Sequence, residues 1–133
     1  LTKPGALSDL ITKNSKKTEL TIKQPYQLAP GEFILAMTAE SISLQISGSP
    51  PHLGARIEGK SSRARIGLLV HCTAPTEHPG WSGPLALEMA NLGPATISLS
   101  PGMHIAQLIV EQIAGEIIQN PSDFQGQADP SGS

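Results

Sequence analysis

Cysteine, aromatic side chains and long apolar runs are all scarce in this sequence of 133 residues. The single cysteine, Cys72, excludes a disulfide within one chain and is typical of a protein of the reducing cytoplasm. No apolar run approaches the roughly 18–20 residues of a membrane span, and no signal peptide is visible. The aromatic residues are one Trp, one Tyr and two Phe, so the core must be aliphatic, and such a subunit gains from forming an oligomer.

A strong charge of either sign is also absent. The formal net charge is −2, which argues against non-specific binding to nucleic acid. The four histidines lack the spacing of metal ligands, and the zinc-deaminase signature H-x-E…P-C-x-x-C is missing, so we expect no zinc and no protein-held metal site. The length predicts a single domain over residues 1–133. The chain begins at Leu1 rather than Met, so further residues can precede it.

Glycine and proline are plentiful, with 13 and 12 residues, and they separate short apolar stretches. This pattern is typical of an all-β sandwich or barrel with many short strands. The stretches expected to form strands are 31–44, 54–59, 64–74, 83–93, 96–102 and 104–118. Helical turns are expected only near 5–14 and at the start of 61–70. The tail, 120–133, is rich in Gly, Pro, Ser and Gln, and is expected to be a disordered end or a flap that orders on a ligand.

The stretch "EGKSSRAR" concentrates two hydroxyls and three cations in one short loop. Ser61, Ser62 and backbone N–H groups can donate hydrogen bonds to a polyphosphate, while Lys60, Arg63 and Arg65 supply charge. The loop is not a Walker motif, because G-x-x-x-x-G-K-[ST] is absent. The residues alone are equally compatible with a phosphate loop and with a solvated basic turn.

The stretch "GPLALEMANLG" contains a carboxylate in an unusual place. In a strand, alternation places Leu85, Leu87 and Met89 on one face and Glu88, between two alanines, on the other. A carboxylate with small neighbours can take a proton from water and return it to a leaving amine. The alternative is that Glu88 simply lies on the solvent face, as most glutamates do.

The order and spacing of these pieces resemble the dCTP deaminase branch of the trimeric dUTPase superfamily. The resemblance rests on "ARIEGKSSRARIGLLVHCTA", "HPGWSG", "LALEMANLG" and "LSPGMHIAQLIVE", which match without gaps from about 55 to 111, with "LAPGEFILAMTAESISL" before them and "FQGQADP" after them. It implies a jelly-roll-like, dUTPase-type β-barrel with little helix, assembled as a homotrimer with active sites at the subunit interfaces. The implied substrate is a deoxynucleoside triphosphate that carries Mg²⁺.

The resemblance also implies roles for individual residues. Glu88, Ser61 and Arg65 match catalytic positions, with Glu88 moving the proton, Ser61 orienting the water and Arg65 reaching a neighbouring subunit's ligand. Gln127 matches a tail glutamine that closes over the nucleotide. The full set implied to contact nucleotide is Lys60, Ser61, Ser62, Arg63, Ala64, Arg65, His78, Ala86, Leu87, Glu88 and Gln127.

Three departures from the family pattern leave the function open. The family usually has Asp where this chain has His78, and a tail lysine where it has Asp123, and the segment 1–24 has no clear match. The first expectation is hydrolytic cleavage of the C–N bond of dCTP, giving dUTP and ammonia. The second is a dUTP diphosphatase, or a bifunctional deaminase–diphosphatase. The third is a catalytically weak trimer that binds nucleotide.

Overall fold

The computed structural model describes residues 11, 13–46, 48–118 and 124–131. Strands are the main regular secondary structure of this part of the chain, and α2 (Ser61–Ala64) is a helix of one turn. The strands are β1 (Tyr26–Leu28), β2 (Phe33–Ser43), β3 (His52–Gly59), β4 (Leu68–Leu69), β5 (Thr76–Glu77), β6 (Ser82–Asn91), β7 (Ile97–Leu99) and β8 (Ala106–Ile113). The prediction of an all-β fold with little helix is confirmed.

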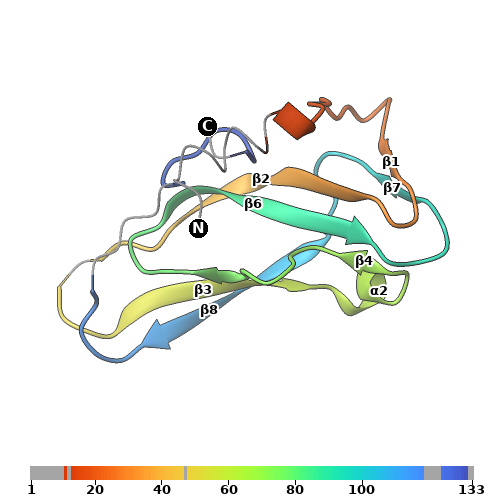
Figure 1. The fold of residues 1–133 in the computed structure, drawn as a ribbon. Helices are drawn as coiled ribbons and strands as arrows, with labels where there is room; N and C mark the ends of the chain where they lie inside the picture. Colours follow the sequence, from red (N-terminus) through yellow and green to blue (C-terminus); the bar gives the residue numbers. More distant parts are fainter. Residues whose placement is uncertain (1–10, 12, 47, 119–123, 132–133) are drawn as a thin grey trace.

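The strands form three small antiparallel sheets, ordered β2-β6-β4, β5-β3-β8 and β1-β7. In Figure 1 the first two are layers that face each other, and the β1–β7 pair lies at one end of them. This is a jelly-roll-like sandwich. Within the described residues, no helix combines the length and the apolar composition that a membrane crossing requires.

The core between the layers is aliphatic, as the composition predicts. Its members are Leu28, Leu44, Ala55, Ile57, Leu68, Val70, Leu85, Leu87, Met89, Ile97 and Leu99, with Trp81 as the one buried aromatic residue among those described. Strand β6 shows how alternation along the sequence places side chains in the core. In β6 the residues Leu85, Leu87 and Met89 are buried and their neighbours are partly exposed, so the predicted alternation is confirmed.

Asn91 at the end of β6 is fully buried, and both polar atoms of its side chain are hydrogen-bonded. Its Nδ2 donates to the carbonyl groups of Leu28 at 2.9 Å and Ala95 at 2.8 Å, while Oδ1 accepts from the Gly93 N–H at 2.9 Å. A buried amide costs stability unless it is paired in this way. Asn91 therefore fixes the turn that leaves β6.

Two glycines bring this turn against the segment that follows α2. A Cβ on Gly67 would lie 2.1 Å from the Gly93 nitrogen, and Gly67 has a φ of +92°. A Cβ on Gly93 would lie 2.1 Å from the Ile66 carbonyl oxygen. Both positions therefore require glycine, and their contact joins the α2–β4 connection to the end of β6.

The stretch 64–74 does not form the strand that its apolar residues predict. The chain turns through Gly67, pairs only at Leu68 and Leu69, and leaves the sheet after Leu69. The Cys72 N–H then bonds to the Glu88 carboxylate instead of to a neighbouring strand. The expected helical turn at the start of 61–70 is confirmed as α2, whereas most of the stretch 5–14 lies outside the described residues.

Candidate active site

A cavity of about 730 Å³ lies against the outer face of the β2–β6 pair. Most of its lining comes from three parts of the chain: the two strands, the segment through β5 to Trp81, and the C-terminal tail; Ile11 and Ile46 also line it. Its lining includes Leu35, Ala74, Thr76, Glu77, His78, Trp81, Ala86, Glu88, Phe124, Gln125, Gln127 and Ser131. The cavity is large enough for a small-molecule ligand.

Glu88 projects from the middle of β6 into this cavity, opposite Leu35 of β2. Its Oε2 accepts a hydrogen bond from the backbone N–H of Cys72 at 3.0 Å. The flanking residues Leu87 and Met89 are buried in the core, which prevents the strand from rotating. The carboxylate is thus held in one orientation on the wall of a cavity, with its second oxygen available for chemistry.

A second carboxyl group, which the sequence reasoning missed, faces the same cavity. Glu77 ends the short strand β5 and pairs with Ala55 of β3. Burial raises the pKa of the Glu77 carboxyl, and the neighbouring His78 opposes this increase. The only sequence signal for Glu77 is its position immediately before "HPGW". The alternation of apolar and polar residues does not predict whether Glu77 is buried.

The C-terminal tail covers one side of the cavity. Gln127 is only 9% exposed and lines the cavity together with Phe124. Gln125 Nε2 donates to the Gly80 carbonyl at 3.3 Å. In Figure 1 the tail lies above the β2–β6 layer, beside the N-terminal segment. The predicted tail position Asp123 lies outside the described residues.

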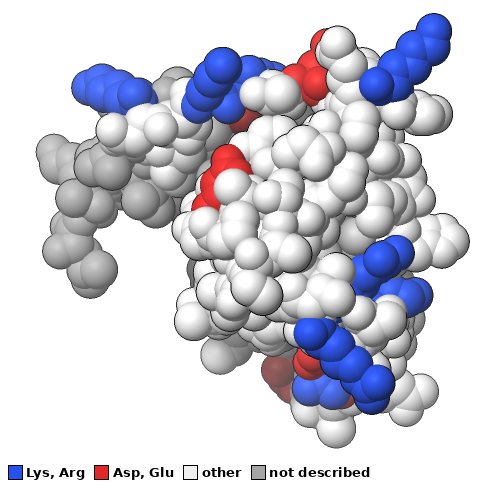
Figure 2. Space-filling model, turned by 90° about the vertical axis from the view of Figure 1, so that its right-hand side faces the viewer, with Lys and Arg blue, Asp and Glu red and all other residues white. Residues whose placement is uncertain are grey.

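The basic loop lies elsewhere. Ser61, Ser62 and Arg65 are exposed, and none of α2 lines the first cavity. Figure 2 turns the end of the molecule that carries α2 toward the viewer, and Lys and Arg gather in its lower part. Lys60 lines a separate cavity of about 400 Å³, and the core residue Leu87 also lines it.

The cations of this loop have no acidic partner within the described part of the chain. Lys60, Arg63 and Arg65 form no ion pair there, whereas Arg56 lies 3.3 Å from Glu111. Three positive charges close together on an exposed turn are therefore available for an anionic ligand.

The structure thus brings together Ala86, Glu88, His78 and Gln127, and it separates them from the predicted residues 60–65. Leu87 faces the core, away from the first cavity. Their roles in binding and catalysis stay predictions. Across the described ranges, no three His, Cys, Asp or Glu side chains are grouped as a metal site would require.

Comparisons with known proteins identify the family of this chain. A family model described as "dCTP deaminase-like" matches residues 3–113. The chain is 42% identical over 117 residues to the "dCTP deaminase, dUMP-forming" of Thermobifida fusca, covering 83% of this chain and 57% of that protein. It is 37% identical over 115 residues to the "dCTP deaminase" of Natronomonas pharaonis, covering 83% of this chain and 56% of that protein. This chain therefore spans a little over half the length of these curated relatives.

Among solved structures, the chain resembles that of native EIAV dUTPase. The two share 24% sequence identity and a TM-score of 0.45, over 81% of this chain and 94% of that chain.

Proposed function

The chain belongs to the dCTP deaminase-like family, and we propose that it hydrolyses the exocyclic C–N bond of dCTP, producing dUTP and ammonia. One observation carries the proposal: Glu88 is fixed on the cavity wall by the Cys72 N–H, beside the small residue Ala86. A positioned carboxylate in a partly enclosed cavity is what proton transfer to and from water requires. The relatives are named dCTP deaminases, which supports dCTP as the proposed substrate.

In the proposed reaction Glu88 takes a proton from water while the water oxygen bonds to carbon 4 of the cytosine ring. Glu88 then returns that proton to the amino group, the C–N bond breaks, and ammonia leaves. The second water proton ends on the uracil ring, so the reaction consumes one water and no other reagent. Ser61 is proposed to orient the water, and Gln127 to contact the bound nucleotide from the tail.

We assign the triphosphate to Lys60, Ser61, Ser62, Arg63 and Arg65 of a neighbouring subunit in a homotrimer. Two observations support this assignment: α2 does not line the cavity of its own chain, and its cations have no acidic partner among the described residues. Apolar side chains on the second sheet, Leu108 and Val110 of β8 among them, are also exposed and are available for a subunit contact.

Magnesium enters this proposal as part of the substrate. The described residues offer no carboxylate cluster for the ion, so its oxygen ligands would be the phosphates and water, which is a usual mode for Mg²⁺. The ion would screen the repulsion between the phosphates. The cytoplasmic location stays a prediction from the single cysteine.

A second candidate function is the formation of dUMP. The names of several relatives include "dUMP-forming", which favours a further hydrolysis of the triphosphate in the same site. The cavity presents His78 where the family usually has a carboxylate, so this step would depend on a different group for positioning water.

An assay of products separates the candidates. The protein is incubated with dCTP or dUTP and magnesium, and ammonia, dUTP, dUMP and pyrophosphate are quantified. Ammonia with accumulating dUTP supports the deaminase, and ammonia with dUMP and pyrophosphate supports the dUMP-forming enzyme. Pyrophosphate from dUTP without ammonia from dCTP indicates a diphosphatase. Binding of dCTP without any product indicates a catalytically weak nucleotide-binding protein, and both proposals then fail.

A further inference from the structure

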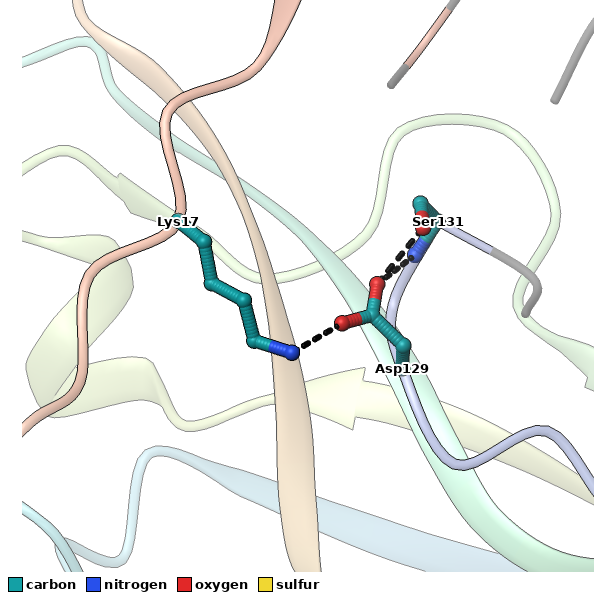
Figure 3. Close-up of polar contacts among 3 residues, drawn as sticks. All are labelled: Lys17, Asp129 and Ser131. Carbon is teal, nitrogen blue, oxygen red and sulfur yellow. Dashed lines mark hydrogen bonds and ion pairs between the residues drawn. The ribbon is translucent and has the colours of Figure 1, made fainter. Parts of the chain in front are cut away.

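The N-terminal segment contacts the C-terminal tail through one carboxylate. Lys17 Nζ lies 2.7 Å from Asp129 Oδ2, across a sequence separation of 112 residues. The other oxygen, Asp129 Oδ1, accepts hydrogen bonds from the Ser131 backbone N–H at 2.9 Å and from its hydroxyl at 2.6 Å. Figure 3 shows the carboxylate between the lysine on one side and the serine on the other.

This contact lies directly behind the cavity wall. Gln127, two residues before Asp129, is 9% exposed, and Gln127 and Ser131 both line the cavity. The tail also passes close to the start of β6, because a Cβ on Gly83 would lie 3.6 Å from Gly126 Cα. Asp129 therefore belongs to a stretch of the tail that lines the cavity on both sides of it, at Gln127 and at Ser131.

The charges at this contact persist over the physiological pH range. Hydrogen bonds from Lys17 and Ser131 hold the pKa of the Asp129 carboxyl well below its usual range. The hydrogen bond to Asp129 raises the pKa of Lys17. Salt rather than pH should therefore weaken the pair, because the Lys17 side chain is 86% exposed.

We infer that Lys17 is a positioning residue, which holds the tail against the cavity through Asp129 and so keeps Gln127 in the wall. The inference rests on the proposed function for its kinetic effect, because only a bound nucleotide would sense the position of Gln127. It assigns a role to the segment 1–24, for which the sequence offered no match. Asp129 itself lies beyond the residues that the family model matches.

The expected effect is modest, a change in affinity of about two- to five-fold, since exposed ion pairs contribute little. Lys17→Gln should raise the KM for dCTP by that factor and leave kcat unchanged. Lys17→Arg should behave like the wild type, and the difference between Lys17→Gln and wild type should disappear in about 1 M salt.

The matched control is Lys16→Gln. Lys16 is an exposed neighbour that forms no ion pair or hydrogen bond with the described residues, so its replacement changes the net charge equally and leaves the tail in place. Equal KM changes in Lys16→Gln and Lys17→Gln would overturn the inference, because they would reflect general attraction of the triphosphate.

A double-mutant cycle tests the coupling directly. Asp129→Asn removes the charge but keeps an oxygen for Ser131. If the pair acts as one unit, Lys17→Gln combined with Asp129→Asn should raise the KM no more than either change alone. Independent, multiplying effects would show that Lys17 does not act through Asp129.

A measurement without nucleotide keeps this test separate from the proposed function. Trp81 is the only tryptophan, and it lines the cavity together with the tail residue Phe124. Acrylamide should quench Trp81 fluorescence more strongly in Lys17→Gln than in wild type or Lys16→Gln. Unchanged quenching would overturn the inference even in an active enzyme. Increased quenching in a protein that deaminates nothing would support the contact and reject the function.

Discussion

The β6 wall of the cavity and the α2 loop are close in sequence but are held in different ways. Glu88 belongs to a strand paired with β2, and its carboxylate is fixed by the Cys72 N–H. The helix α2 has no buried residue, and its cations form no ion pair within the described ranges. Contacts within one chain therefore orient Glu88, the group proposed for chemistry, whereas the residues proposed for phosphate binding lie at the surface.

The largest expected effect concerns Glu88 on the β6 wall of the cavity. Glu88→Gln keeps a carbonyl oxygen that can accept from the Cys72 N–H, but it removes the proton acceptor. We expect ammonia release from dCTP to fall about 10²- to 10⁴-fold, while dCTP still binds. Ammonia release and nucleotide affinity should be measured together. Glu116→Gln, an exposed carboxylate outside the cavity, is the control, and normal turnover in Glu88→Gln would remove Glu88 from the mechanism.

Arg65→Ala tests the role of the exposed α2 loop. The loss of a charge-assisted contact to phosphate should lower kcat/KM for dCTP about 30- to 100-fold and weaken nucleotide binding. Arg56→Ala is a matched control, because Arg56 is already paired with Glu111. Steady-state kinetics measure the change in kcat/KM, and calorimetry measures the affinity of the protein for a triphosphate. If affinity and rate both survive, α2 is the solvated basic turn that the sequence also allowed.

Mixing two inactive variants tests whether the two regions meet between subunits. Glu88→Gln and Arg65→Ala chains, unfolded together and refolded at a ratio of one to one, should recover about a quarter of the wild-type activity if each site takes these residues from different chains. Separately refolded variants mixed afterwards are the control. No recovery in verified hybrid trimers would place Glu88 and Arg65 of one site on the same chain.

The contrast between the two regions also explains what the sequence could and could not predict. Alternation along 83–93 predicted which face of β6 carries Glu88, because a strand buried on one side imposes that pattern locally. The "PG" turns at 30–31, 79–80 and 101–102 are likewise present. The burial of Glu77 depends on pairing with β3, and the Lys17–Asp129 contact joins distant segments, so neither leaves a local signal.

Asn91 fixes the turn through which the end of β6 contacts the α2–β4 connection. Its replacement should have a smaller but clear effect. Asn91→Ala leaves the carbonyl groups of Leu28 and Ala95 and the Gly93 N–H without their present partner. We expect the free energy of unfolding to fall by about 2–4 kcal/mol, measured by denaturant titration. Gln112→Ala, which removes an exposed amide on β8, should have little effect. Equal stability of the two variants would show that the β6 turn does not depend on Asn91.

The smallest expected effect concerns Glu77, which lines the same cavity as Glu88. Burial raises the pKa of this carboxyl in the folded protein above its ordinary value of 4.5, so the folded state holds the proton more tightly than the unfolded state. Stability attributable to Glu77 is therefore highest below about pH 4 and falls as the pH rises through the raised pKa. Glu77→Gln cannot ionise, so it should be more stable than wild type at neutral pH.

The pH dependence separates this explanation from a simple gain in packing. The difference in melting temperature between Glu77→Gln and wild type should grow from pH 4 toward neutrality and then become constant, because Glu77 ionises in the folded state only above its raised pKa. The exposed control Glu116→Gln should show no such growth. A difference that is already complete at pH 4 would mean that Glu77 is not desolvated by the cavity.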